Sequence, residues 1–196
     1  ASDVYKRQIN MSPAVMFRVI EKFKPTILID EGDTFLKDNE DMRCMLNGGH
    51  NRQTCTVWRS VGDTHEPKPF KVWAPKALAM IGSPADTVED RSIVVHLKRK
   101  LKTDKIGGFN ERRKAELYPI QRMLARWYED NQISLRSCRP EVPEALNDRA
   151  QDNVRALCAI ADVVGGHWPE TLRQAFVELA QAREEAQQVS NGVMLL

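Results

Sequence analysis

Two neighbouring acidic residues at the end of a short apolar run are the residues whose types and spacing best suit chemistry. In "PTILIDEGDTF", residues 25–35, the apolar run 27–29 leads directly into Asp30 and Glu31, and Asp33 follows. A first carboxylate at such a strand end can hold Mg²⁺, directly or through water, while the metal bridges nucleotide phosphates. The second carboxylate can orient and polarise an attacking water as a general base.

These acids need a buried strand to position them. We interpret residues 26–30 as such a strand, because open α/β sheets bind their ligands at the carboxyl ends of the strands. In the alternative interpretation, Asp30 only caps the helix that follows, and the pattern is too short to decide between the two. A third interpretation makes Asp30, Glu31 and Asp33 a metal-nuclease cluster. It requires the strand to have ended, since adjacent side chains on a strand point to opposite faces.

The first half of the sequence alternates helical and extended patterns. Ser12 and Pro13 begin a helix that Pro25 ends, and helical spacing returns over residues 34–49. Short apolar runs, bounded by turn signals as buried parallel strands are, predict further strands at residues 54–61, 70–74, 76–82 and 92–97. The polar segment between the first two of these runs predicts a β-hairpin.

Beyond about Thr103 the pattern becomes helical throughout. Apolar residues recur at helical spacing over residues 110–131, 147–166 and 168–188. Pro119 lies inside the first of these helices, so we expect a kink or a split there. We therefore predict an α/β part over residues 9–103 and an all-helical part over residues 104–196.

Composition is that of an ordinary globular protein. Of the 196 residues, 42% are hydrophobic and 29% are charged, and no apolar run approaches the roughly 20 residues of a membrane span. No secretory signal is visible, so we expect a cytoplasmic protein without a membrane partner. The four cysteines form no CxxC pair, which favours reduced thiols. A metal site drawn from Cys44, His50, Cys55 and His65 is conceivable, but its spacing matches no zinc pattern.

Cations gather in two places although the formal net charge is only +2. Ten Lys or Arg residues lie between Lys98 and Arg126 against three acids. Such a cluster can hold a phosphate backbone, or it can be a solvated surface.

The second group of cations lies on the predicted hairpin, where Arg59, Lys68 and Lys71 are interleaved with Trp58 and Trp73. Cations among aromatic residues suit single-stranded nucleic acid, through phosphate attraction and base stacking. In the alternative, the tryptophans pack inward and the cations form an ordinary surface. We expect the tryptophans to pack inward, and the hairpin sequence leaves the role of the cations open.

Five segments occur in an order that resembles one family. They are "SPAVMFRVIEKFKPTILIDEGDTFL", "LNGGHNR", "WAPKALAMIG", "DTVEDRSIVV" and "LNDRAQDNVRALCAIADVVGGHWP", which cover most of residues 12–170. Together they resemble a domain-of-unknown-function family of P-loop ATPase, helicase-like proteins from phages, plasmids and integrated elements, often joined to primase modules. The resemblance implies part of a P-loop core, with a mostly parallel sheet and a β-hairpin insertion, followed by an all-helical lid.

The resemblance also implies roles for individual residues. Asp30 and Glu31 would be the Walker B pair, with Asp30 as the metal ligand. Arg91, just before residues 92–97, stands where an arginine finger of AAA+-type ATPases is common, and a local ion pair with Glu89 or Asp90 is the alternative.

Two further positions match sensor residues of that class. Ser83 stands where a polar sensor residue is usual, although "GSPADT" departs from the expected Leu-Pro pattern. Arg149 would be the lid-side sensor, and a helix-terminal arginine without a ligand is the alternative. Val154 stands where the family usually has an aromatic residue, which puts the detailed packing of the lid in doubt. The hairpin resembles the insertion of several DNA-translocating ATPases, and Arg59, Lys68 and Lys71 would contact DNA.

One expected motif is missing. The sequence contains no G-x-x-x-x-G-K-[ST], whose amides and lysine grip nucleotide phosphates. The opening "ASDVYKRQ" fits no later element and resembles translated sequencing-adapter sequence, so residues 1–8 are left out of the fold and we expect an N-truncated fragment; a degenerate relative is the alternative. We predict that this chain alone binds ATP poorly.

We expect the parent protein to couple Mg²⁺-dependent ATP hydrolysis to movement on, or remodelling of, DNA in the replication of a mobile element. The DNA would be single-stranded, and the parent would be a homo-oligomeric ring with a fused or partner primase. The rival function is a non-hydrolysing nucleic-acid-binding module derived from an ATPase.

Overall fold

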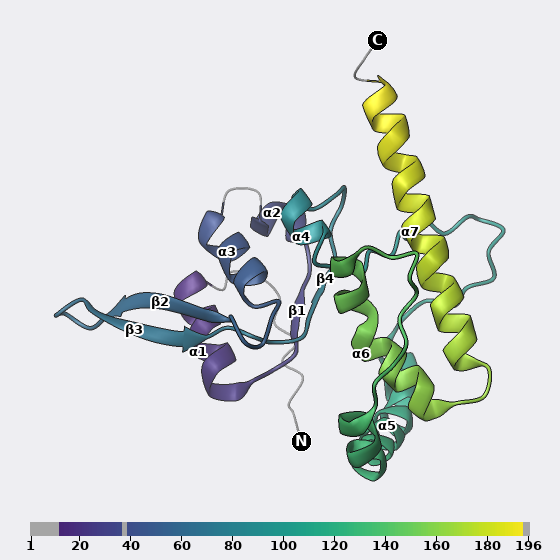
Figure 1. The fold of residues 1–196 in the computed structure, drawn as a ribbon, viewed down its shortest axis with the longest axis horizontal. Helices are drawn as coiled ribbons and strands as arrows, with labels where there is room; N and C mark the ends of the chain where they lie inside the picture. The colour runs from purple at the N-terminus through teal and green to yellow at the C-terminus, as the bar shows by residue number, and fades with distance from the viewer. Residues whose placement is uncertain (1–11, 37–38, 194–196) are drawn as a thin grey trace. The chain divides into compact units, whose positions relative to one another are not determined.

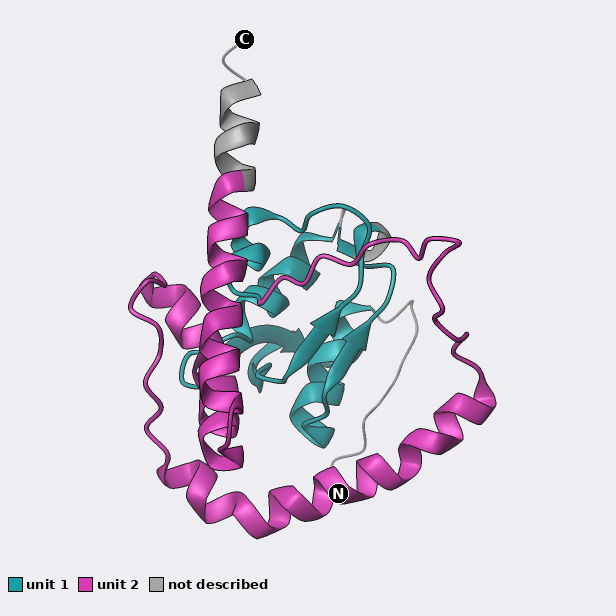
Figure 2. Ribbon diagram, turned by 90° about the vertical axis from the view of Figure 1, so that its right-hand side faces the viewer, with its two compact units in different colours: residues 1–92 teal, residues 93–196 magenta. Residues whose placement is uncertain are grey.

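The computed structural model describes residues 12–36 and 39–193, and its elements are labelled in Figure 1. The chain divides into two compact units, residues 1–92 and 93–196 (Figure 2). The strands lie in the first unit and the long helices in the second, with about half of the chain helical. The fold is therefore mixed α/β, with small sheets followed by helices. The predicted leader, residues 1–8, lies outside the described residues.

A parallel pair of strands is the centre of unit 1. Strand β1 (Ile27–Ile29) lies beside β4 (Lys76–Leu78), in register from Ile27 opposite Lys76 to Ile29 opposite Leu78. The pairing continues beyond β1, because the Ala79 N–H donates to the Ile29 carbonyl at 2.8 Å. Strand β4 is shorter than the predicted run 76–82. The connection between the two strands contains two helices and the hairpin, as a parallel crossover requires.

The predicted hairpin is confirmed. Strands β2 (Thr56–Val61) and β3 (Glu66–Lys71) pair antiparallel, and β3 begins before the predicted run because it includes Pro67 and Pro69. The Val72 N–H donates to the Cys55 carbonyl at 2.9 Å, so even-numbered residues of β3 present their N–H groups to β2. The two prolines occupy odd positions on the free edge, where a missing N–H costs no ladder bond.

The core of unit 1 lies between its helices and the hairpin. Helix α1 (Pro13–Phe23) buries Met16, Phe17 and Ile20. The Phe17 and Phe70 rings pack with their centroids 4.4 Å apart, and this contact fixes α1 against β3. Val15, which helical spacing predicts on the buried face, is 44% exposed.

The prediction of one helix over residues 34–49 was wrong. The structure has α2 (Gly32–Leu36) and a separate α3 (Glu40–Gly48), with residues 37–38 outside the described part. The Asn39 side chain accepts the Met42 N–H at 3.0 Å. Asparagine is a favoured N-cap because it satisfies a first-turn amide, so the chain starts a new helix at this point.

The predicted strand at residues 92–97 is also absent from the structure. After the short α4 (Asp86–Glu89) the chain is irregular, and Val95 and Leu97 are 65% and 90% exposed. A strand needs a partner for its amide and carbonyl groups. In the described part of the chain, the parallel sheet consists of β1 and β4 alone. The apolar run pairs with neither of these two strands.

Unit 2 contains three long helices, all at predicted positions: α5 (Glu111–Ser137), α6 (Asp148–Val164) and α7 (Trp168–Val193). Helix α5 is uninterrupted and contains Pro119, so the expected split does not occur. Leu146, Val154, Cys158 and Phe176 form the core between α6 and α7. Leu157 and Val164, which helical spacing places on the same face of α6 as Val154, are instead 40% and 47% exposed.

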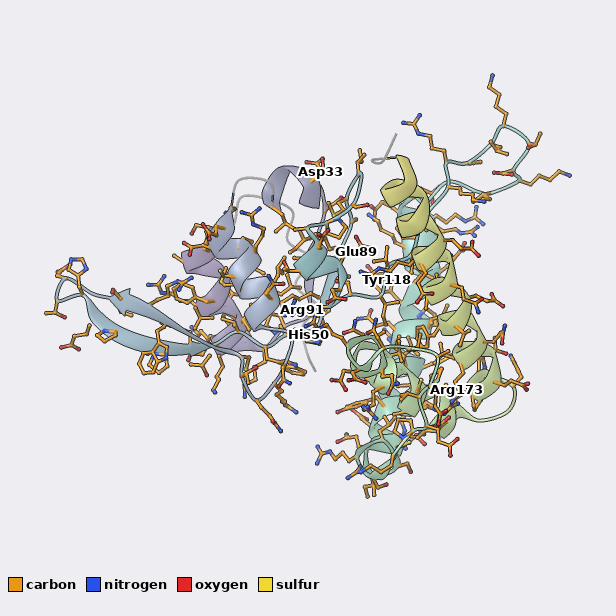
Figure 3. The ribbon with its side chains drawn as sticks, turned by 45° about the horizontal axis from the view of Figure 1, so that its top comes forward. Asp33, His50, Glu89, Arg91, Tyr118 and Arg173 are labelled. Carbon is orange, nitrogen blue, oxygen red and sulfur yellow. The ribbon has the colours of Figure 1, made fainter. Side chains whose placement is uncertain are left out.

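One arginine fixes the connection between α6 and α7. Arg173, labelled in Figure 3, forms an ion pair with Asp162 at 2.8 Å and donates to the Glu141 and Pro169 carbonyls. Both charged side chains are about three-quarters buried, so each is satisfied by the other. Among the helices of residues 12–36 and 39–193, none is both long and apolar enough to cross a membrane.

Candidate functional site

Asp30 and Glu31 lie in a tight turn just beyond β1. The strand ends at Ile29, so neither acid is part of the ladder, and both side chains are exposed. Glu31 has a φ of +56°, a left-handed conformation that costs energy in a residue with a Cβ. The Asp30 Oδ1 accepts the Glu31 N–H at 3.0 Å. The chain therefore holds two adjacent carboxylates in a strained turn at the carboxyl end of a strand.

This turn is joined to the end of β4. The Gly32 N–H donates to the Ala79 carbonyl at 2.9 Å. A Cβ on Gly32 would lie 2.4 Å from the Leu78 Cδ1, so only glycine allows this approach. The Asp33 Oδ1 accepts the Ile81 N–H at 3.3 Å. The acid turn and the loop after β4 thus form one edge, and Asp33 acts there as a structural acceptor.

The carboxylates of this edge suit a magnesium ion that arrives with a nucleotide. Mg²⁺ keeps several waters and is commonly bound by one or two carboxylates together with substrate phosphates. One oxygen of the Asp30 carboxylate accepts the Glu31 N–H. Because Asp30 is exposed, its other oxygen is available to bind a metal ion. Within the described residues, no three His, Cys, Asp or Glu side chains converge as metal ligands. This argues against the nuclease cluster and against the Cys/His metal site.

Arg91 follows α4 in unit 1, and Figure 3 labels it together with Asp33 and His50. Its Nη1 donates to the Thr87 carbonyl at 2.7 Å, and the Thr87 hydroxyl accepts from Asn47 at 3.2 Å. Arg91 is thus connected to the segment "LNGGHNR". Among the described residues, no hydrogen bond or ion pair joins Arg91 to Asp30 or Glu31. The structure does not bring the predicted arginine finger and the acids of the same chain together.

The two predicted sensor residues lie in different units. Ser83 is exposed in the loop after β4, two residues beyond the Ile81 amide that Asp33 binds. It therefore belongs to the same edge as the acids. Arg149 is exposed in the first turn of α6 in unit 2, where the Asn147 side chain caps the helix by accepting the Ala150 N–H at 2.9 Å.

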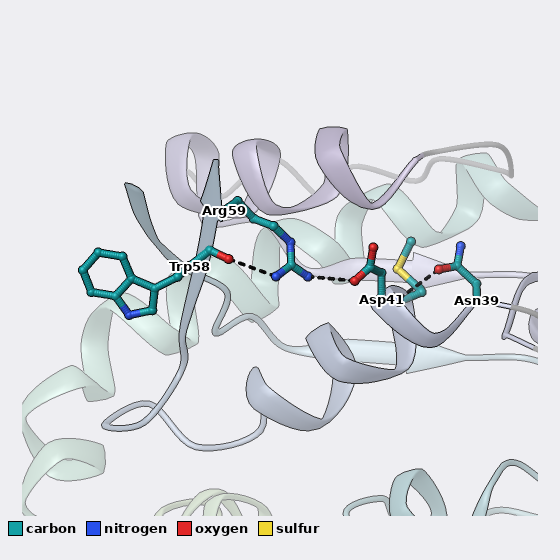
Figure 4. Close-up of polar contacts among 5 residues, drawn as sticks. Asn39, Asp41, Trp58 and Arg59 are labelled. Carbon is teal, nitrogen blue, oxygen red and sulfur yellow. Dashed lines mark hydrogen bonds and ion pairs between the residues drawn. The ribbon is translucent and has the colours of Figure 1, made fainter. Parts of the chain in front are cut away.

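The three hairpin cations predicted to contact DNA all have partners within unit 1. Arg59 forms an ion pair with Asp41 at 3.1 Å and donates to the Trp58 carbonyl at 3.0 Å (Figure 4). The Lys71 ammonium donates to the Thr56 hydroxyl at 2.7 Å. The Lys68 ammonium lies 5.4 Å from the centre of the Phe70 ring. These contacts make the hairpin a weaker phosphate-binding surface than its sequence suggests.

The hairpin tryptophans do not both pack inward. Trp58 is 61% exposed, because the alternation of β2 places its neighbour Val57 toward the core. Trp73 is half-buried, with the Arg52 guanidinium 4.6 Å from its ring centre. The prediction was therefore wrong for Trp58, which leaves one large aromatic surface on the outer face of the hairpin.

Lys76 is a structurally important residue that the sequence analysis did not single out. Its ammonium donates to the Gly49 and Ala74 carbonyls at 3.1 and 3.0 Å. Burial lowers the pKa of Lys76 to about 8, and the nearby Cys55 opposes part of this shift. A lone lysine at the start of an apolar strand, directly after Pro75, is the sequence signal that could have identified it. Its role is to hold the Gly48-Gly49 turn against β4.

Two comparisons relate this chain to other proteins. The model of a family described as "Protein of unknown function (DUF3631)" matches residues 96–196, about half of the chain. An "Uncharacterized 28.9 kDa protein in xis 5'region" of Saccharopolyspora erythraea is 29% identical over 101 residues, which are 51% of this chain and 38% of that protein. The chain thus spans well under half the length of this relative. No solved structure matches the present chain.

Proposed function

The chain belongs to the DUF3631 family, and from that premise we propose that it is part of an ATP-hydrolysing, helicase-like protein whose phosphate chemistry uses Asp30 and Glu31. The observation that carries the proposal is the parallel β1–β4 pair, with both acids in a constrained turn at its carboxyl end. Nucleotides bind at this end of parallel strands in α/β proteins. The resemblance of the surrounding motifs to P-loop ATPases supports the same class.

In this proposal the two carboxylates divide the work. Asp30 would hold the Mg²⁺ that accompanies the nucleotide, and the metal would neutralise charge on the phosphates. Glu31 would accept the hydrogen bond of the attacking water and orient it as a general base. The turn that carries them is tied to β4 through Gly32 and Asp33, and a restrained turn would lower the cost of orienting the reactants.

Arg91 would act on the nucleotide of a neighbouring subunit, which makes the parent protein a ring. One guanidinium nitrogen is held by the Thr87 carbonyl, and the remaining donors can reach phosphate oxygens. Ser83 and Arg149 would sense the nucleotide from the loop after β4 and from α6.

The parent protein would use hydrolysis to move on or remodel single-stranded DNA during replication of a mobile element, with a primase as partner. The hairpin would contact the DNA through Arg59, Lys68 and Lys71. These cations would first have to exchange their partners within unit 1 for phosphates. Trp58 supports this contact, because its exposed ring offers a surface on which a base can stack.

The test is Mg-ATP hydrolysis with and without single-stranded DNA. We would compare this chain, the chain extended upstream in its gene, and the extended form carrying Glu31→Gln. Glu144→Gln is the matched control, because Glu144 is an exposed glutamate outside the elements that the proposal uses. We expect hydrolysis only in the extended wild type and the control, with stimulation by DNA. Equal activity in Glu31→Gln, or no activity in any form, contradicts the proposal.

A further inference from the structure

The loop between α4 and α5 contains a closed turn at residues 98–105, which we call the basic turn. The Asp104 N–H donates to the Leu101 carbonyl at 3.1 Å, and the Asp104 carboxylate accepts the Leu101 N–H at 2.7 Å. The Lys100 ammonium closes the base of the loop by donating to the Ile106 carbonyl. The segment therefore has a defined conformation although it contains no helix or strand.

Four cations of the basic turn form no hydrogen bond or ion pair with the described residues. They are Lys98, Arg99, Lys102 and Lys105, all of which are exposed. The single acid of the turn is Asp104, and one of its carboxylate oxygens accepts the Leu101 N–H. Over residues 12–36 and 39–193, no carboxylate pairs with these four cations, so the turn presents a local positive charge.

Three cations of the adjoining helix behave differently. In α5, Lys114 pairs with Glu111, Arg112 with Glu116 at 3.7 Å, and Arg126 with Asp130 at 2.8 Å. Each pair joins residues three or four positions apart on the helix surface. In the region between residues 98 and 126, three of the five cations of α5 therefore have acidic partners, whereas the four exposed cations of the turn have none among the described residues.

An exposed aromatic ring lies next to the turn. Phe109 is 66% exposed, and it directly precedes Asn110, whose side chain caps α5 by accepting the Arg113 N–H at 3.0 Å. The Arg113 guanidinium reaches beside Gly107, where an added Cβ would lie 3.5 Å from it. Cations on a short loop, with an aromatic ring fixed at the start of a helix, are the two components that bind single strands.

We propose that the basic turn and Phe109 bind single-stranded nucleic acid, with the four cations on backbone phosphates and the ring stacked on a base. An anionic membrane would attract the same charges. Interfacial membrane segments, however, are amphipathic helices with a continuous apolar face, and the basic turn is irregular. This site lies in unit 2 and needs no nucleotide, so it does not depend on Asp30 and Glu31.

The experiment measures binding of the full chain to a fluorescent oligothymidylate by anisotropy, over a series of salt concentrations and without nucleotide. One variant replaces Lys98, Arg99, Lys102 and Lys105 with glutamine. The matched control replaces Arg112, Lys114, Arg126 and Arg155 with glutamine, which removes the same charge from residues that have acidic partners. A third variant is Phe109→Leu. Circular dichroism verifies that all variants fold.

We expect the turn variant to bind more weakly than the wild type. The slope of log affinity against log salt concentration should become less steep by about 3, since each of the four phosphate contacts to a single strand contributes roughly 0.7 to it. The helix control should keep most of the wild-type slope. Phe109→Leu should bind at least about fivefold more weakly with an unchanged slope, because stacking is lost and no charge is removed.

Three outcomes would overturn the proposal. The wild type does not bind the oligonucleotide, or the turn variant and the helix control lose the same affinity and slope, or Phe109→Leu binds like the wild type. Vesicles containing phosphatidylserine are tested in parallel by cosedimentation. Turn-dependent binding to vesicles without binding to the oligonucleotide would assign the site to a membrane surface instead. An ATPase result for Glu31→Gln has no bearing on any of these outcomes.

Discussion

The Asp33 carboxylate accepts the Ile81 backbone N–H at 3.3 Å, across 48 residues of sequence. This bond joins the helix that follows the acid turn to the loop that follows β4. Asp33 therefore has a different function from Asp30 and Glu31, although all three acids lie within four residues. The three acids that the nuclease interpretation groups together divide into two candidate catalytic residues and one residue that positions their turn.

We expect Asp33→Asn and Asp33→Ala to have different effects. Asparagine keeps an oxygen acceptor for the Ile81 amide, whereas alanine removes it. Alanine should lower the free energy of unfolding by about 1 kcal/mol, the net value of one such hydrogen bond, and asparagine by less. Urea denaturation measures both changes. Equal destabilisation by the two substitutions would show that the charge of Asp33, and not its acceptor oxygen, stabilises the turn.

Two adjacent glycines should respond in opposite ways to alanine. A Cβ on Gly49 would lie 2.3 Å from the Val72 carbonyl oxygen, 2.7 Å from the Lys76 ammonium and 2.9 Å from the Met45 carbonyl oxygen. Since two of these atoms are backbone, Gly49→Ala should destabilise by roughly 1–3 kcal/mol.

Gly48 is the built-in control, because it is the last residue of α3 and a Cβ there meets nothing within 4 Å. Gly48→Ala should be neutral or slightly stabilising, since alanine is the better helix former. Thermal unfolding of the two variants and the wild type checks the prediction. A similar loss of stability in both variants would mean that the close approach at Gly49 is not what limits the side chain.

Lys76 should make stability depend on pH in the alkaline range. Its pKa is lowered to about 8 in the folded protein, against an ordinary value of 10.5, because burial disfavours the charged form. Between these two values the unfolded chain binds more protons, so the free energy of unfolding should rise with pH through this window. The rise from this group is at most roughly 3 kcal/mol.

Lys76→Met should remove that rise, and Lys68→Met, which replaces an exposed lysine, should retain it. Urea denaturation of the three proteins at several pH values between 8 and 10.5 measures the difference. Parallel stability curves for the wild type and Lys76→Met would contradict the assignment.

Asp41→Asn tests whether the hairpin contacts DNA. The Arg59–Asp41 pair is partly exposed, so its loss should cost less than about 1 kcal/mol of stability. If the hairpin binds DNA, releasing Arg59 from its carboxylate should raise the affinity for single strands severalfold. Anisotropy with an oligonucleotide measures this. Glu40→Gln, which removes an exposed neighbouring acid on α3, controls for the general change in charge. An increase in the control equal to that in Asp41→Asn would exclude a specific effect.

Local patterns predicted most of the helices and the hairpin. The three helices of unit 2 were predictable because apolar spacing, Asn147 as a cap and Pro169 in a first turn agree. The sequence did not show which apolar runs pair with a neighbouring strand. Residues 92–97 are apolar enough for a strand, yet strand formation depends on a neighbouring strand, which a local pattern does not reveal.

The sequence predicted where the candidate site lies in the fold but not its local conformation. Sequence placed Asp30 and Glu31 at the end of a strand, and the structure has them there, but the left-handed turn at Glu31 and the bond from Ile81 to Asp33 depend on contacts distant in sequence. The pairing of charges was likewise not visible. In the sequence, Arg59 and Lys98 are both simply cations in a cation-rich segment. The structure shows that Arg59 has a carboxylate partner and that Lys98 has none among the described residues.

The two prolines of β3 have a consequence for how copies of this protein meet. In Figure 1 the hairpin runs outward from the helices of unit 1, and its outer face bears the exposed ring of Trp58. An outstretched ribbon of this kind invites edge-to-edge pairing with a second molecule, and such pairing is a route to aggregation. Pro67 and Pro69 remove two amide donors from the free edge of β3. A second strand cannot complete its hydrogen bonds there, so the two prolines disfavour growth of the ribbon into a larger sheet from the β3 side.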